Sequence, residues 1–107
     1  MANLFKNAKV DLTTTNATTL YTCPSATTAI VKSILVSEDS NNADTLTLTL
    51  TNSSSAIFSI YKDKAVSAKQ TLELFSAPLV VEESEILKVT AATADRLHVV
   101  ASILEVS

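Results

Sequence analysis

The chain contains no glycine and no tryptophan, and it has only one cysteine, two prolines and one histidine. With a single cysteine, a disulfide within the chain and a cysteine zinc site are both excluded. Phosphate-binding loops and dinucleotide fingerprints are excluded as well, because both need glycine. Turns that require a positive φ must therefore use Asn, Asp and Ser, which tolerate that conformation next best.

Basic clusters and long apolar runs are missing too. The eight Lys and Arg residues are scattered and the net charge is −3, whereas a nucleic-acid binder normally carries a basic patch. No apolar run approaches the ~20 residues of a membrane span, and the N-terminal MANLFKNAKVDL lacks the apolar core of a secretory signal. A hydrophobic content of 47% in 107 residues predicts one globular domain, residues 1–107, that binds neither nucleic acid nor membrane.

One stretch, DTLTLTLTN from Asp44 to Asn52, alternates leucine and threonine without exception. Period-two alternation of apolar and polar residues is typical of a strand with one buried face. Threonine is β-branched and favours a strand even where it faces water. We expect the leucines to enter the core and the threonines to form a flat, uncharged outer row, which either stays solvated or contacts a neighbouring subunit. The row consists of Thr45, Thr47, Thr49 and Thr51.

The same alternation recurs along the chain, separated by polar clusters and two prolines, and no segment convincingly predicts a helix. Eight or nine short strands at this spacing predict an all-β fold, an antiparallel β-sandwich of jelly-roll-like organisation. Periodicity does not give the order of the strands. The expected strands are Phe5–Asp11, Thr18–Cys23, Thr28–Glu38, Thr45–Asn52, Ala56–Lys62, Thr71–Phe75, 79–81, 85–92 and 96–106.

The last expected strand is apolar on both faces. Leu97, Val99, Ala101 and Ile103 point one way, and Val100, Leu104 and Val106 point the other way with His98 and Ser102. One face must meet the core. The other is covered by a loop or by another copy of the protein, which would indicate assembly, unless a bulge exchanges the two faces midway.

Candidates for chemistry are few. His98 lies in an expected strand without a recognisable nucleophile or orienting group, and Cys23 lacks the positive surroundings that activate a thiol. The acidic segment from Glu38 to Asp44 offers oxygen ligands for calcium but not the EF-hand spacing, so we interpret it as a solvated hairpin loop. Four aromatic residues are expected in the core rather than in a sugar-binding platform: Tyr21, Phe58, Tyr61 and Phe75. We predict no catalytic residue, metal site or cofactor.

Several segments, in order and across nearly the whole chain, carry a family resemblance. They are FKN at 5–7, TTLYTCPSATTAIVKSILVS at 18–37, YKD at 61–63, LELFSAPLVVEE at 72–83, and EILKVTA followed by LHVVASILE. Together they resemble small structural proteins of tailed bacteriophages, especially marine and cyanobacterial ones. Two positions depart from that pattern: Cys23 replaces an aliphatic residue, and the turn Glu82–Glu85 lacks a glycine. The resemblance implies a virion component rather than an enzyme, and it supplies no ligand or catalytic residues.

These observations predict a non-enzymatic capsid decoration or cement protein that binds the major capsid protein, or another virion protein, on the outer capsid surface. The alternatives are a tail, neck or baseplate component and, in another class, a carbohydrate-binding or adhesin module. Leu4 and Phe5 lie in residues 1–9, which form either a docking arm or the first strand, and they join the threonine row as candidate interaction residues. We also expect a homo-oligomer such as a trimer.

Overall fold

A computed structural model describes residues 3–107 of the chain. All secondary-structure elements in this range are β-strands. The all-β prediction is therefore confirmed, and the expected strands agree with the observed ones to within a few residues. The largest difference is in β5, which runs on to Val66 because a bulge near Asp63 lets the strand continue. The strands are β1 (Asn3–Asp11), β2 (Thr18–Thr22), β3 (Thr28–Glu38), β4 (Asp44–Thr51), β5 (Ile57–Val66), β6 (Thr71–Glu73), β7 (Leu79–Val81), β8 (Ile86–Ala91) and β9 (Leu97–Val106).

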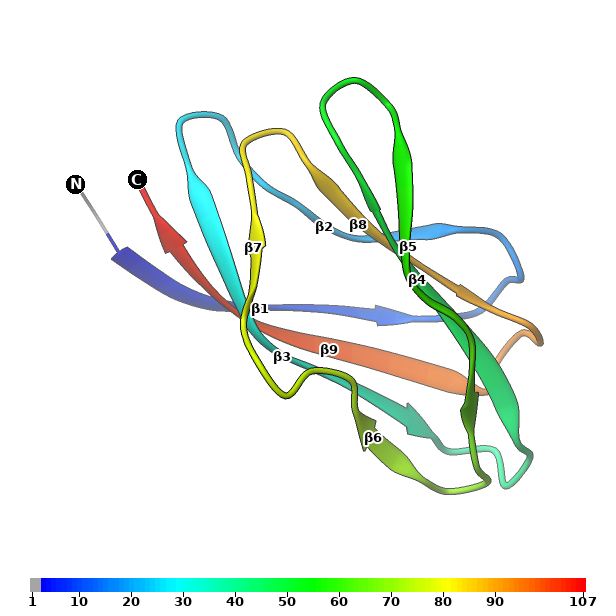
Figure 1. Cartoon of the computed structure of the whole chain (residues 1–107). Helices are drawn as coiled ribbons and strands as arrows, with labels where there is room; N and C mark the ends of the chain where they lie inside the picture. Colours follow the sequence, from blue (N-terminus) through cyan, green and yellow to red (C-terminus); the bar gives the residue numbers. More distant parts are fainter. Residues whose placement is uncertain (1–2) are drawn as a thin grey trace.

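The strands form two antiparallel sheets (Figure 1). Sheet A has the order β1-β9-β3-β6, with β7 also paired to β3, and sheet B has the order β2-β8-β4-β5. The pairs β4–β5, β3–β6, β2–β8 and β1–β9 are nested in the sequence. The chain thus follows one long hairpin, bent between β4 and β5 and rolled into two sheets, which is a jelly roll. The predicted jelly-roll sandwich is confirmed.

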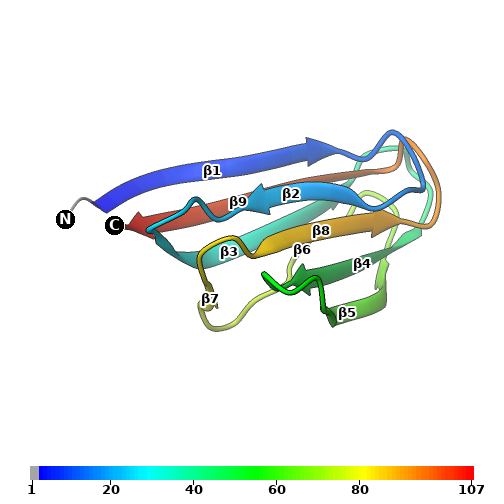
Figure 2. The same ribbon diagram turned by 90° about the horizontal axis from the view of Figure 1, so that it is seen from above.

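The two sheets lie face to face and bury alternate residues between them (Figure 2). In β4, Leu46 and Leu48 are fully buried and Leu50 is half-buried, so the leucine face does enter the core. Each fully buried leucine contributes about 1.5–3 kcal/mol of hydrophobic free energy. Buried and more exposed residues alternate along β9 without interruption from Leu97 to Val106. The register shift in the β3–β9 pairing lies in β3, between Val31 and Ser33. A face-exchanging bulge in the last strand is therefore wrong.

The turns are made without glycine, as the composition requires. Five of the residues with positive φ are Asn, Asp or Ser, as predicted, but Ala26 and Lys69 are not. An L-residue in this conformation costs roughly 1–2 kcal/mol. In both exceptions a carboxylate holds the strained residue by its backbone N–H: Glu83 accepts from Ala26, and Glu38 accepts from Lys69 at 2.9 Å.

The acidic segment after β3 is solvated as its sequence indicates, since residues 39 and 41–43 are exposed, but it is not a hairpin loop. It leads from β3 in sheet A to β4 in sheet B, and so it crosses between the two sheets. Its first and last carboxylates turn inward, leaving Glu38 only 2% and Asp44 only 7% exposed. The Asp44 carboxylate accepts a hydrogen bond from the N–H of Thr93 at 3.1 Å, in the loop before β9. Local sequence could not show this, because the crossover depends on the order of the strands.

Candidate interaction surface

The outer side of sheet A carries apolar side chains in rows that run across the strands. Pairing aligns Phe5 with Leu104, Leu104 with Ile30, and Ile30 with Val80, and a second row aligns Val100 with Leu35. Directly opposed residues of antiparallel strands point to the same side of the sheet. We call this set the apolar face. It consists of Phe5, Ile30, Leu35, Val80, Val100 and Leu104.

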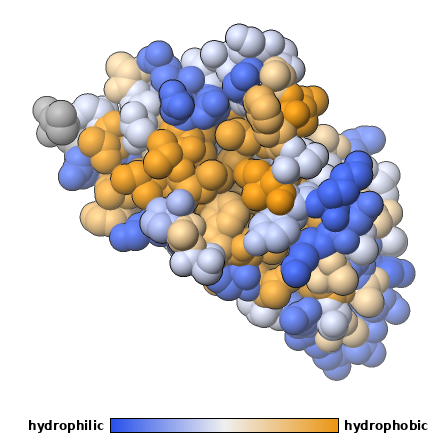
Figure 3. All heavy atoms as spheres, viewed as in Figure 1, coloured by the Kyte–Doolittle hydropathy of each residue, from blue (hydrophilic) through white to orange (hydrophobic). Residues whose placement is uncertain are grey.

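The apolar face is open rather than covered. Phe5 is 72% and Val80 is 54% exposed, and Leu35 and Val100 are each about two-fifths exposed. Figure 3 shows a continuous hydrophobic area over the part of the surface that carries β7 in Figure 1. Single exposed apolar residues are normal, but aligned ones across neighbouring strands mark an interaction site.

Phe5 is held in place on the apolar face by β3. The Nζ atom of Lys32, at the register shift of β3, lies 5.9 Å from the centroid of the Phe5 ring, a favourable cation–π distance. A shallow hollow of about 340 Å³ separates Phe5 from the second row, and Asn7, Lys32 and Ser102 line it. The surface therefore offers an aromatic knob beside a hollow with polar walls.

Leu4 does not share a surface with Phe5. Residues 3–11 form β1 and pair with β9 along their whole length, so alternate side chains leave on opposite sides of the sheet. Leu4 is opposite Glu105, on the side that faces sheet B, yet it is 54% exposed. Residues 1–2 of the expected docking segment lie outside the described residues. The two candidates at the N-terminus are thus presented by a strand and face different directions.

The threonine row lies on the outer side of sheet B, and all four of its residues are half-buried. Strands β8 and β5 flank it, so that Thr49 lies opposite both Lys88 and Ser59. The residues paired with Thr45, Thr47 and Thr49 are small or polar, whereas Thr51 lies between Ile86 and Ile57, which is 68% exposed. No aromatic residue is paired with the row. The row itself is uncharged and lies on the outer side of the sheet, as its sequence indicates, although Lys88 lies beside Thr49. Its role in contacts stays a prediction.

Two members of the row differ from one another. Thr47 stabilises the β5 bulge: its hydroxyl accepts from the Asp63 N–H at 3.1 Å and donates to the Asp63 carboxylate at 3.4 Å. The Thr51 hydroxyl is buried and has no hydrogen-bond partner among the described residues. A substitution at Thr47 would therefore disturb β5 itself, which makes Thr49 the better residue for testing whether the row meets a partner.

At one end of the sandwich, the Glu38 carboxylate organises the crossover loop. It accepts hydrogen bonds from Ser40, through its N–H at 2.7 Å and its hydroxyl, from the Asn42 N–H at 3.2 Å, and from the Lys69 N–H. Burial alone would raise the pKa of Glu38, but these hydrogen bonds favour the carboxylate and lower its pKa to about 2. These hydrogen bonds hold the β3–β4 loop and the β5–β6 loop around a single carboxylate.

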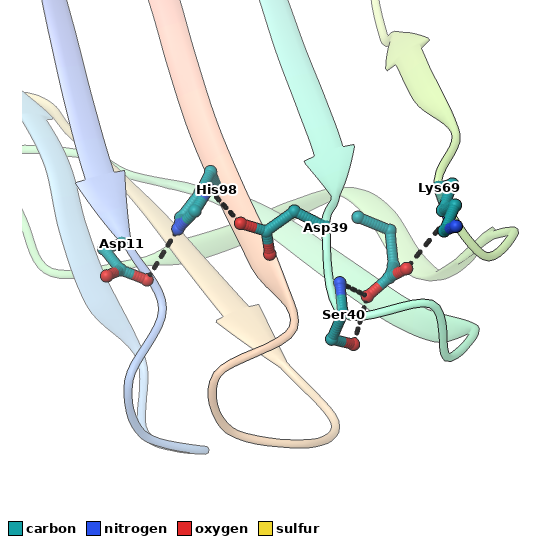
Figure 4. A network of polar contacts seen from close by, with 6 residues as sticks. Asp11, Asp39, Ser40, Lys69 and His98 are labelled. Atoms are coloured by element: carbon teal, nitrogen blue, oxygen red, sulfur yellow. Dashed lines mark hydrogen bonds and ion pairs between the residues drawn. The ribbon is translucent and has the colours of Figure 1, made fainter.

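His98 lies nearby, between two carboxylates (Figure 4). Its Nε2 atom is 3.1 Å from Asp11 and its Nδ1 atom is 3.3 Å from Asp39. With Lys9 and Val100, it lines a second shallow hollow of about 350 Å³ beside the apolar face. Since all three side chains of the cluster are at least two-fifths exposed, each contact stabilises the fold by about 1 kcal/mol or less.

The opposite end contains a buried polar contact between the sheets. The Tyr21 hydroxyl donates to the Glu105 carboxylate, which also lies 3.4 Å from Lys6 Nζ. Burial, together with this hydrogen bond, raises the pKa of Tyr21. Burial likewise raises the pKa of Cys23, which is only 1% exposed. A raised pKa keeps this thiol protonated rather than reactive.

The aromatic residues do not all enter the core. Tyr21 is buried, and Tyr61 and Phe75 are half-buried with ring centroids 6.5 Å apart. Phe58, also expected in the core, is 55% exposed. It pairs with Leu50 near the end of the β4–β5 hairpin, where the opposite sheet no longer covers the inner side.

Among residues 3–107, no group of three or more His, Cys, Asp and Glu side chains is placed to hold a metal ion. The same residues contain no helix long and apolar enough to cross a membrane.

No protein-family model and no curated protein sequence matches the chain. Among solved structures, a chain from the structure of infectious bursal disease virus Gt strain is similar, with a TM-score of 0.47 and 9% sequence identity. The similarity covers 98% of this chain but only 30% of that chain.

Sequence reasoning identified Phe5 and placed Val100 and Leu104 on the second face of the last strand, but it missed the other half of the apolar face: Ile30, Leu35 and Val80. The signal was present in β3, which is apolar at both odd and even positions, as β9 is. Two strands that are apolar on both sides form an apolar outer surface if they pair with each other in the sheet. The pairing of β3 with β9 was the missing information, since the paired positions lie between 59 residues (Glu38–Leu97) and 78 residues (Thr28–Val106) apart in the sequence.

Proposed function

We propose that the protein is a non-enzymatic virion structural protein of a tailed bacteriophage, and that it decorates the outer capsid surface. The apolar face of sheet A carries the proposal. It would bind the major capsid protein or another virion protein, with apolar anchors in the centre of the contact and a polar rim around them. The resemblance of the sequence to phage structural proteins supports the virion location.

The geometry suits attachment by a surface rather than by a cleft. Phe5 and Val80 are the most exposed members of the apolar face, and exposed aromatic anchors contribute most to protein contacts. Lys32 and Lys9 lie at its margin, and Glu73 continues the row of Leu35. A capsid repeats the same site many times, so a modest affinity for each site is sufficient when copies are linked.

The location is tested by copy number. Quantitative mass spectrometry of purified particles should find a copy number close to that of the major capsid protein. A far smaller number would assign the protein to the tail, neck or baseplate instead, and absence from particles would contradict a virion role altogether.

The contact is tested by substituting one exposed residue on each outer face. Val80→Lys should reduce incorporation into particles at least about tenfold, because a charge would be desolvated against the partner. Thr49→Lys, on the outer side of sheet B, should leave incorporation unchanged. Both variants must show the wild-type circular dichroism spectrum and Tm. The opposite result would assign the contact to the threonine row.

These substitutions replace a deletion of residues 1–9, which the sequence suggests as a test of a docking arm. Because β1 pairs with β9 along its whole length, the deletion would uncover the edge of β9 and damage the fold. Loss of incorporation would then say nothing about contacts.

A further inference from the structure

The four outer edges of the two sheets differ in how they are protected. Edge strands attract further strands, and proteins protect them with short lengths, bulges and lysines. Strand β5 has two register shifts and exposes Lys62 and Lys64; β2 has five residues and a shift; β6 and β7 have three residues each. Strand β1 has nine residues and pairs with β9 without any shift.

The charges on β1 do not protect its edge, because groups of the same chain engage them. Lys6 lies 3.4 Å from Glu105, Lys9 donates to Asn7 at 3.1 Å, and Asp11 lies 3.1 Å from His98. The edge is also sterically open, since β1 lies beyond β2 of the other sheet (Figure 2). The first half of β1 is exposed on both sides.

The backbone groups that point to this edge can be identified. The Leu12 N–H donates to the Leu97 carbonyl at 3.0 Å, one step beyond the Asp11–His98 pair. Hydrogen-bonded and non-hydrogen-bonded pairs alternate along an antiparallel ladder, and both groups of a residue point the same way. Even-numbered residues of β1 therefore bond β9, and odd-numbered ones direct their N–H and C=O groups to the free edge: Asn3, Phe5, Asn7, Lys9 and Asp11. The Asp11 carbonyl also accepts a hydrogen bond from the Thr13 N–H at 3.0 Å.

We propose that β1 pairs with β1 of a second copy, antiparallel about a two-fold axis at Asn7. This is the register in which all nine residues find partners, and it places odd-numbered residues opposite odd-numbered ones, as hydrogen bonding requires. Leu4 meets Val10 of the second copy, Phe5 meets Lys9, and Lys6 meets Ala8. No two like charges are directly opposed, and the exposed Leu4 side chain gains an apolar neighbour.

The dimer joins the two A sheets into one continuous sheet. Because the two-fold axis is perpendicular to it, both apolar faces lie on the same side. The row that ends at Phe5 continues into Lys9, Val100 and Leu35 of the second copy. Self-association therefore doubles the surface to which the proposed function assigns binding, but it is an independent property that can be measured on the protein alone.

Sedimentation velocity of the purified full chain over a range of concentrations tests the proposal. The wild type and Asn7→Ala, which keeps the backbone N–H, should form dimers. Asn7→Pro should bind at least about tenfold more weakly, because proline removes the edge donor at the axis. It leaves the β1–β9 ladder intact, since that ladder uses even-numbered residues, and an unchanged circular dichroism spectrum and Tm should confirm this.

A distance measurement tests the register without disturbing the axis. A nitroxide at Asn3→Cys should lie about 27 Å from its copy, since eight residues separate Asn3 from its own number across the pair at about 3.4 Å each. Buried Cys23 is not accessible to the label. A chain that stays monomeric at every concentration, a dimer that Asn7→Pro leaves unchanged, or a clearly different label distance would each overturn the proposal.

Discussion

The two outer faces of this sandwich come from the same alternating pattern but carry different chemistry. On sheet B, the outward positions of β4 are threonines, with small or polar neighbours except at Thr51, which Ile57 and Ile86 flank. On sheet A, the outward positions include Ile30 and Leu35 of β3, Val80 of β7, Val100 and Leu104 of β9 and Phe5 of β1, interspersed with polar residues such as His98 and Ser102. Alternation determines which residues leave the core. The residue types at the outward positions decide whether a face of the sandwich is hydrated or suits contact with another protein.

The largest expected effect is the difference in free energy of unfolding between a substitution in the core and one on the apolar face. Leu48→Ala, in the buried row behind the threonines, should lower the free energy of unfolding by about 2–5 kcal/mol because it leaves a cavity. Val80→Ala, on the apolar face, should lower it by less than about 0.5 kcal/mol. Urea unfolding of both variants measures this. Equal losses would mean that the apolar face belongs to the core, and the comparison of the faces would fail.

The next effect depends on pH and concerns the crossover that joins the two sheets. The pKa of Glu38 is lowered to about 2, so its stabilisation is present above the ordinary glutamate value and is lost as the pH falls through the folded-state pKa. Glu38→Gln should be less stable than the wild type at pH 7, and the difference should shrink between pH 4.5 and 2.

Urea unfolding at several pH values gives that difference directly. Glu73 also has a lowered pKa, because hydrogen bonds from Ser33 and nearby backbone N–H groups outweigh its burial, but it is present in both proteins and cancels in the comparison. A stability difference that stays constant across this pH range would contradict the role of Glu38.

The smallest expected effect is a difference in free energy of unfolding between two substitutions within the threonine row. Thr51→Val should raise the free energy of unfolding by about 1 kcal/mol, because it removes a buried hydroxyl without a partner among the described residues. Thr47→Val should lower it by about 0.5–1 kcal/mol, because the Asp63 N–H loses its acceptor. Thermal unfolding of the pair measures both. Changes of the same sign would mean that the row acts as one uniform surface.

Much of the fold was predictable because its signal is local. The Leu and Thr alternation of β4 gave both the strand and its buried face, and the absence of glycine gave most of the turn residues. Ala26 and Lys69 escaped prediction because the carboxylates that hold them are contributed by distant segments. The hairpin expected for the Glu38–Asp44 segment was wrong for a similar reason: the order of the strands makes the segment a crossover between the two sheets, with its two end carboxylates buried.

Periodicity predicted the strands and most of the residues that enter the core, because alternation acts over a few neighbouring residues, and a single cysteine excluded a disulfide within the chain. The tertiary structure alone decided which strands are neighbours. That decision brought Phe5, Leu104, Ile30 and Val80 into one row and separated Leu4 from Phe5. It also left β1 as the long, unprotected edge. Surfaces depend on pairings between residues far apart in the chain, and no local pattern encodes those pairings.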